Sequence, residues 1–240
     1  MSWSTYSWTP PTPARRITTS RTELLQLGVA YLVLTVCLLL VFSGNTFLGS
    51  GFAPPGFHGI SVALVVVSAL ASLTGFVAHE MAHKISAQRQ GFWAEFRTSP
   101  YGLAVALMTS ILGFIVAAPG ATVVGGINAV DRRSWGRTSL AGPLTNLGFS
   151  AVFYAASVVP YLYARKVLIE GTPLFDWLLV LAFINAWFGT FNLFPFGVLD
   201  GRKVLAWSRQ AWAGAISLTL VAMVFTVLAL YFLGGPLLSR

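Results

Sequence analysis

The chain alternates between long apolar stretches and short polar connections. A helix that spans a membrane needs about 20 predominantly apolar residues. Five stretches reach that length, at about 24–45, 59–84, 139–164, 174–200 and 211–235. A sixth, at about 101–119, is of similar length but is followed by the Pro- and Gly-containing segment APGATVVGG. We therefore predict an all-α polytopic membrane protein with about five to six transmembrane helices.

The sixth stretch decides on which side of the membrane all later residues lie. The connection at 46–58 has no Lys or Arg, whereas three arginines precede the first span. If 101–119 crosses, nine of the fifteen cations lie on the side of the N-terminus; if it dips in and returns, twelve do. Cytoplasmic connections carry an excess of Lys and Arg. We therefore predict a short membrane-associated re-entrant element at 101–126, with a strand at 121–126 and the N-terminus inside.

Composition supports this class and narrows the possible partners. The chain is 56% hydrophobic and 9% charged, whereas soluble domains are about 25% charged. The net charge of +8 does not indicate nucleic acid, because the cations lie in short clusters between apolar stretches. There they set topology and contact lipid headgroups. Cys37 is the single cysteine and lies in an apolar stretch, which excludes a disulfide framework and a thiolate metal site.

The first 22 residues differ from the rest of the chain. They are polar, rich in Pro and Thr, and contain no acidic residue. They lack the apolar centre of a signal peptide. We predict a flexible tail over 1–22 and a single transmembrane domain over 23–240.

The second apolar stretch ends in the segment AHEMAHK. Residues 59–78 carry no formal charge, and His79, Glu80 and His83 follow directly. Residues four apart lie on one face of an α-helix, so the two histidines can bind one ion. Neutral imidazoles suit zinc, and Glu80 can reach a metal-bound water without being a ligand. Histidines at a helix end near Lys84 are also compatible with a structural role, but ionisable groups within a membrane span favour function.

A catalytic zinc requires a third protein ligand and an open position for water. His58 lies a full helix length from the motif, and Cys37 is isolated in another stretch. Among the acids, Asp200 ends a long apolar stretch, although such a residue alone is also typical of a turn after a helix. If 101–119 is re-entrant, Asp200 and His83 lie on the same side of the membrane; if it crosses, they are separated. Charge distribution and metal chemistry thus predict the same topology.

Three motifs resemble those of the site-2 protease family, which comprises intramembrane zinc metalloproteases. They are HEMAH as H-E-x-x-H, AGPLTN at 141–146, and NLFPFGVLDG at 192–201 as N-x-x-P-x-x-x-L-D-G. The first motif occurs in many zinc proteases, but the three together in this order are specific. They imply homology over about 59–205.

The resemblance also implies roles for individual residues. His79, His83 and Asp200 would bind Zn²⁺, and Glu80 would be the general base. Asn192, and with it Asn146, would polarise or orient the scissile carbonyl. The asparagines could instead bond neighbouring helices within the membrane.

We predict a zinc-dependent intramembrane endopeptidase that cleaves transmembrane segments of other proteins in the lipid bilayer. The expected location is the cell membrane, with the active site toward the cytoplasmic side. Peptide cleavage needs an extended substrate, and the edge of the strand at 121–126 could accept one, although a purely structural hairpin fits equally. The alternative is a non-proteolytic metal-binding or metal-transporting membrane protein, which should offer further ligands along a path.

Overall fold

A computed structural model describes residues 17–44, 46, 60–115, 119–125, 131–163 and 167–233. In this part of the chain, five helices are long and apolar enough to cross a membrane. They are α1 (Arg21–Phe42), the continuous helix formed by α2 (Val62–Ser72), η1 (Leu73–Val77) and α3 (Ala78–Arg89), α5 (Arg132–Tyr163), α6 (Leu174–Asn192) and α8 (Arg209–Leu233). These helices correspond to the five predicted spans and confirm the all-α polytopic fold.

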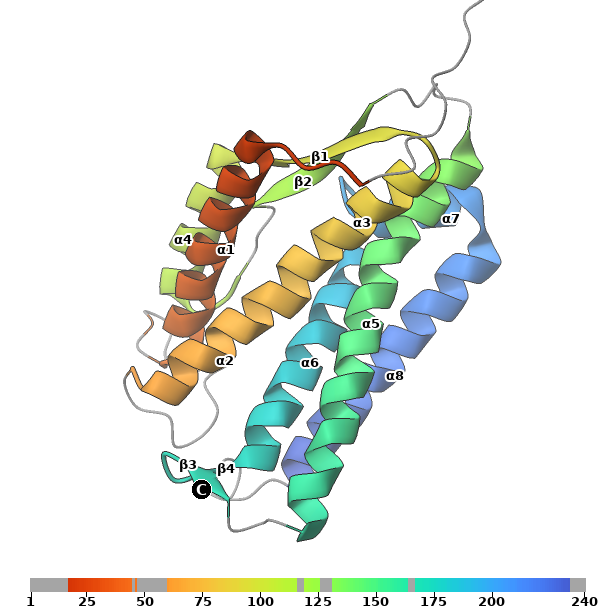
Figure 1. The fold of residues 1–240 in the computed structure, drawn as a ribbon. Helices are drawn as coiled ribbons and strands as arrows, with labels where there is room; N and C mark the ends of the chain where they lie inside the picture. The colour runs from red at the N-terminus through yellow and green to blue at the C-terminus, as the bar shows by residue number, and fades with distance from the viewer. Residues whose placement is uncertain are drawn as a thin grey trace, which may run out of the picture.

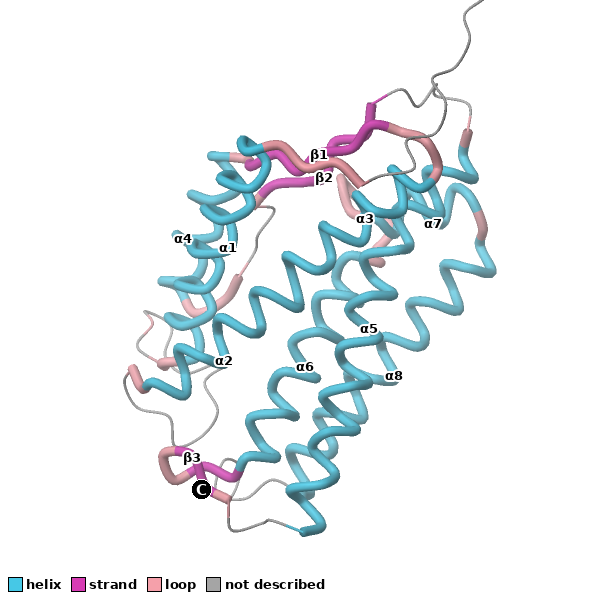
Figure 2. Tube along the Cα trace, viewed as in Figure 1, coloured by secondary structure: helices cyan, strands magenta, loops and turns pink. Residues whose placement is uncertain are grey.

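The helices run roughly alongside one another, so that the molecule has two distinct ends (Figure 1). One end carries strands β1 (Trp93–Thr98) and β2 (Gly120–Gly125), together with the short helix α7 (Asp200–Trp207). The opposite end carries the small hairpin β3 (Leu168–Ile169) and β4 (Thr172–Pro173), as Figure 2 shows. Below, the first end is called the sheet end and the second the hairpin end.

The sixth apolar stretch enters and returns at the sheet end. Its helix α4 (Pro100–Leu112) has 13 residues, too few for a typical span, and Gly113 ends it in a left-handed conformation with φ 106°. The N–H of Ser99 donates to the carbonyl of Pro119 at 3.0 Å, so both ends of the segment meet. This geometry confirms the re-entrant prediction. The predicted strand is β2, and Gly126 lies outside the described residues.

The spanning helix in the apolar stretch at 174–200 is shorter than the stretch itself. Helix α6 ends at Asn192, and turns occupy the next seven residues before α7 begins at Asp200. Gly197 in this connection has a positive φ of 60°. A Cβ on Gly201 would lie 1.9 Å from the carbonyl oxygen of Leu193, so α7 can fold back this closely only with glycine there. The turn therefore places Asp200 at the start of a separate helix.

A buried ion pair fixes the sheet and α1 to the helix that carries the histidines. Lys84 Nζ lies 2.5 Å from Glu23 Oε2, and both residues are fully buried. The other carboxylate oxygen of Glu23 accepts the N–H of Phe96 on β1 at 3.0 Å. Removing one charged partner would leave the other buried and uncompensated, which is strongly destabilising. The pair therefore holds α1, α3 and β1 together.

Side chains of neighbouring helices cover the outer edge of β1. The covered backbone groups and their partners are Ala94 O with Gln88 Nε2, Phe96 N–H with Glu23 Oε1, and Thr98 N–H with Gln26 Oε1. The inner edge of β1 pairs antiparallel with β2, with Phe96 opposite Thr122. The remaining edge of this two-stranded sheet is the outer edge of β2.

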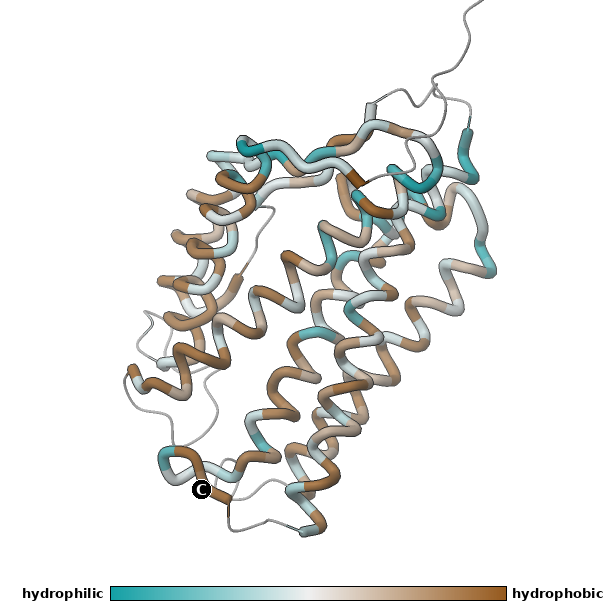
Figure 3. The backbone as a smooth tube through the Cα atoms, viewed as in Figure 1, coloured by the Kyte–Doolittle hydropathy of each residue, from teal (hydrophilic) through white to brown (hydrophobic). Residues whose placement is uncertain are grey.

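The positive charges gather at the sheet end. Every Lys and Arg among the described residues lies in an element or helix terminus at that end. The middle of each long helix is mainly apolar, as the brown segments in Figure 3 show. Arg165, Lys166 and Arg240, which we expected opposite, lie outside the described residues. The described cations therefore lie at one end of the helix bundle.

This arrangement predicts the accessibility of single cysteines in a Cys37→Ala background. Ser134 and Ser208 lie at the sheet end and Gly171 at the hairpin end, so a membrane-impermeant maleimide applied to one side should label either the first two or the third. A cysteine at Ser20 is the reference for the N-terminal side. Labelling of Ser134 and Ser20 from opposite sides would show that 101–119 crosses, contrary to the fold.

Candidate metal centre

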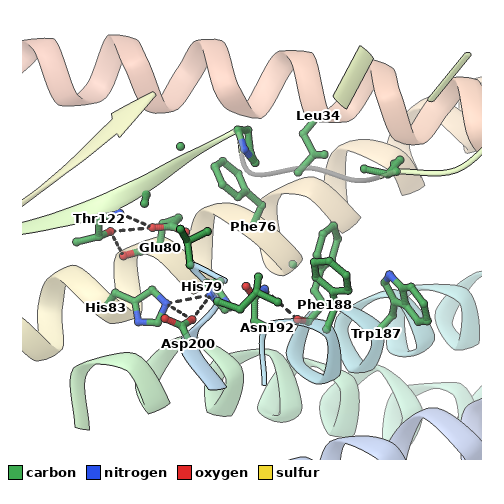
Figure 4. A pocket seen from close by; sticks show the side chains of 18 of the residues that line it. Leu34, Phe76, His79, Glu80, His83, Thr122, Trp187, Phe188, Asn192 and Asp200 are labelled. Atoms are coloured by element: carbon green, nitrogen blue, oxygen red, sulfur yellow. Dashed lines mark hydrogen bonds and ion pairs between the residues drawn. The ribbon is translucent and has the colours of Figure 1, made fainter. Parts of the chain in front are cut away.

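His79 and His83 lie one turn apart on α3, as the H-E-x-x-H spacing requires. Their Nε2 atoms are 2.9 Å apart, and both residues are buried. The third side chain comes from α7: Asp200 Oδ2 lies 3.3 Å from Nε2 of His79 and 2.9 Å from Nε2 of His83. Figure 4 shows the three side chains converging on one point. The structure thus brings together the three predicted ligands, although Asp200 lies more than 100 residues after the two histidines in the sequence.

Hydrogen bonds behind the imidazole rings determine which nitrogen carries the proton. Nδ1 of His83 lies 2.7 Å from the carbonyl oxygen of Thr138, which can only accept. Nδ1 of His79 lies 2.5 Å from Oδ1 of Asn146, whose Nδ2 donates to the carbonyl of Gly75 at 2.9 Å. Both Nδ1 atoms are therefore protonated, and both Nε2 lone pairs point toward Asp200.

Two nitrogen lone pairs and a carboxylate oxygen at such short distances repel one another unless a cation lies between them. Two imidazoles and one carboxylate form a donor set that zinc prefers. Carbonyl or carboxamide partners behind each histidine are also typical of zinc sites, since they orient the ring and raise its basicity. The residues present therefore fit Zn²⁺, with His79, His83 and Asp200 as its ligands.

A glycine of the AGPLTN motif keeps space free beside the ligands. A Cβ built on Gly142 would lie 2.5 Å from Nε2 of His83 and 2.6 Å from Nε2 of His79. These distances place the methyl group where an ion would have to sit. The close approach of α5 to α3 at this point therefore requires glycine.

Replacing Gly142 by alanine is consequently expected to lower zinc affinity by at least about tenfold, since the ligands must separate to admit both the methyl group and the ion. Zinc bound per chain, measured at a series of buffered free-zinc concentrations, tests this. Gly148→Ala, on the same helix but with nothing within 4 Å of the added atom, is the matched control. Equal affinity in wild type and Gly142→Ala would contradict the assigned ion position.

Asp200 is oriented by a second contact. Its Oδ1 lies 3.4 Å from Nζ of Lys203, one turn later on α7, so that Oδ2 faces the histidines. Nζ of Lys203 also lies 5.8 Å from the ring centre of Trp135 on α5. The ammonium group of Lys203 this close to Asp200 favours the ionised form of the carboxyl group. The carboxylate is therefore in the form that binds a metal.

Glu80 lies beside the ligand cluster and is not one of its members. Its Oε2 accepts the N–H of Thr122 at 2.8 Å and lies 2.9 Å from the hydroxyl of the same residue. The side chain is buried and lines the cavity, next to β2 (Figure 4). This position, adjacent to the ligands but separately bound, is what a general base for a metal-bound water requires.

The two predicted asparagines lie in different environments. Asn192 lines the cavity, and its Nδ2 donates to the carbonyl of Phe188 at 3.0 Å. Asn146 is fully buried behind His79, so the expected contact with a scissile carbonyl does not follow from its position. A contact of Asn192 with a substrate carbonyl stays a prediction.

A buried polar chain behind Asn146 was missed in the sequence. Nδ2 of Asn146 faces Oδ1 of Asn185 at 3.4 Å, and Nδ2 of Asn185 donates to Thr74 at 2.9 Å. Thr74 and Gly75 belong to the π-helical turn η1, whose widened backbone offers the Gly75 carbonyl to Asn146. The sequence feature that could have identified Asn185 is its polar side chain within an otherwise apolar span.

The cluster opens into a largely apolar cavity of about 330 Å³. Helices α1 and α6 supply most of its apolar walls, and the outer edge of β2 supplies another side; its lining includes Leu34, Leu38, Phe114, Trp187, Phe188 and Thr122. The metal-binding side chains therefore lie at one point of a cavity whose other walls are mostly apolar side chains of the membrane-spanning helices.

Comparison with known proteins gives one match across most of both chains. The chain is 30% identical over 164 residues to a Methanocaldococcus jannaschii protein named as a "putative zinc metalloprotease". The match covers 68% of this chain and 79% of the M. jannaschii protein. No family model and no solved structure matches the chain.

Proposed function

This chain belongs to the same family of zinc metalloproteases as the M. jannaschii protein, and on that premise we propose that it is an intramembrane endopeptidase of the site-2 protease type. It cleaves transmembrane segments of other membrane proteins. The observation that carries the proposal is the His79, His83 and Asp200 cluster within a bundle of membrane-spanning helices. A peptide bond can reach this cluster most directly from within the bilayer, through the apolar cavity.

Different residues of the chain have different roles in the proposed reaction. His79, His83 and Asp200 hold Zn²⁺, which when bound supplies Lewis acidity and lowers the pKa of a bound water. Glu80 takes the proton that the attacking water loses and delivers it to the leaving amine. Asn192, on the cavity wall, orients the scissile carbonyl. The apolar walls exclude bulk water and so strengthen each of these electrostatic interactions.

The substrate is extended where it is cut, because a helical amide is shielded by its own hydrogen bonds. Among the described residues the outer edge of β2 has no neighbouring strand, whereas side chains cover the corresponding edge of β1. Glu80 accepts the N–H of Thr122 at this edge of β2, and Gly120 and Val124 line the cavity on either side of it. A substrate strand can therefore pair with β2, in the manner of β-augmentation. We place the site toward the cytoplasmic side of the cell membrane, since the described cations gather at that end.

A metal transporter is the rival function. It would hold its ion at successive sites along a path, whereas the described residues contain one cluster of three or more metal-binding side chains. That cluster lies next to Glu80, a base that transport does not need. The arrangement favours hydrolysis.

The direct test uses the zinc-loaded protein purified in detergent with labelled model transmembrane peptides. We expect cleavage inside the apolar segment, loss of cleavage after zinc removal with a chelator, and recovery on zinc addition. A peptide of the same length locked as a helix should be cut more slowly. Zinc binding with no cleavage of any transmembrane peptide, together with zinc uptake into proteoliposomes, would instead support transport.

A further inference from the structure

We infer that Thr122 on β2 is a positioning residue for the general base Glu80, an inference that rests on the proposed proteolytic function. Two donors of this one residue hold the same carboxylate oxygen: its N–H at 2.8 Å and its hydroxyl at 2.9 Å from Oε2. The hydroxyl also lies 3.0 Å from the backbone carbonyl of Glu80. Figure 4 shows these contacts between the strand and the motif helix.

Strand register explains why the N–H of Thr122 is free for this contact. Thr122 stands opposite Phe96, whose own N–H points away from β2 and donates to Glu23. In an antiparallel strand pair, two residues opposite each other either exchange two backbone hydrogen bonds, or both direct their N–H and C=O groups away from the partner strand. The N–H of Thr122 therefore points away from β1 and toward the motif helix. A one-residue change of register would turn it into the sheet.

Holding one carboxylate oxygen leaves the other for the proton of the attacking water. A base that is fixed in one orientation before the substrate binds needs no reorganisation during the reaction. Even a small displacement of the base from that orientation lowers the reaction rate. The amide of Thr122 alone would allow the carboxylate to rotate about that bond. The hydroxyl supplies the second anchor, so valine at this position should loosen the base without removing it.

The same strand is the one that we propose pairs with substrate. Thr122 and its neighbours Gly120 and Val124 line the cavity along the outer edge of β2. The same strand would therefore position both the base and the substrate. Glu23 and Lys84 anchor that sheet to α3 from its other side.

The test compares Thr122→Val, which keeps the shape but loses the hydroxyl, with Thr122→Ser, which keeps both donors. We expect Thr122→Val to lower kcat about tenfold with KM and zinc content unchanged, and Thr122→Ser to stay close to wild type. Thr226→Val, which removes a buried hydroxyl on α8, is the matched control. A wild-type kcat for Thr122→Val, an equal loss in both variants, or a loss that follows zinc content would overturn the inference. Absence of cleavage by the wild type would instead count against the proposed function.

A measurement that needs no activity tests the contact itself. Without the Glu80 carboxylate, the amide of Thr122 has no acceptor, so its hydrogen exchange in the metal-free Glu80→Ala protein should be faster than in metal-free wild type. The amide of Thr98, which donates to Gln26, should be unchanged and serves as the internal reference. Unchanged protection of Thr122 in Glu80→Ala would overturn the inference even if the wild type cleaves nothing.

Discussion

Glu80→Gln is expected to abolish proteolysis while leaving the fold and the zinc content unchanged. The amide has the size of the carboxylate and can still accept the hydrogen bonds of Thr122, but it cannot take a proton from water. A general base contributes about 10²–10⁴ in rate, so cleavage should fall by at least about a hundredfold. Single-turnover cleavage of a labelled transmembrane peptide, with zinc measured on the same sample, gives both quantities.

Glu95→Gln is the matched control for this substitution. Glu95 is on β1 and pairs with Arg97 at the surface of the sheet, away from the ligand cluster. It should cleave at the wild-type rate. If Glu80→Gln also cleaves at that rate with zinc bound, then Glu80 is not the base and the mechanism assigned to this site is wrong.

We expect the wild type to bind about one zinc ion per chain and Asp200→Ala to lose most of it. The substitution leaves two histidines from one helix, which is one ligand fewer than a catalytic zinc site uses. Loss of a partner behind a ligand already costs about 10–100-fold in metal affinity, so loss of a ligand should cost more than about a hundredfold. Zinc per chain after dialysis against buffered free zinc measures the effect.

Two further variants are measured in the same way: Asp200→Asn tests the ligand a second time, and Asp131→Asn is the control. The first keeps the shape of the ligand but removes its charge, and it should also lose zinc. The second changes an exposed acid that caps the start of α5, and it should bind zinc as the wild type does. Full zinc occupancy in both Asp200 variants would exclude this residue from the site.

The pattern of residues along the chain determined those features that depend only on residues close together in the sequence. The lengths of the apolar stretches predicted the five spanning helices, because a membrane sets a minimum length for any helix that crosses it. The spacing of His79 and His83 predicted that they share a helix face, because 3.6 residues per turn fixes that relation. Counting cations predicted the return of 101–119, which the bond between Ser99 and Pro119 bears out.

Tertiary structure alone decided how those parts meet. The sequence pointed to Asp200 as the third ligand, but its approach depends on the turns after Asn192 and on Gly201 packing against Leu193. Likewise, no local pattern predicted that Thr122 would hold Glu80, because that contact requires the register of β2 against β1. Such contacts join segments far apart in the chain, and their geometry follows from the packing of whole helices and strands, which a local pattern of apolar and polar residues does not encode.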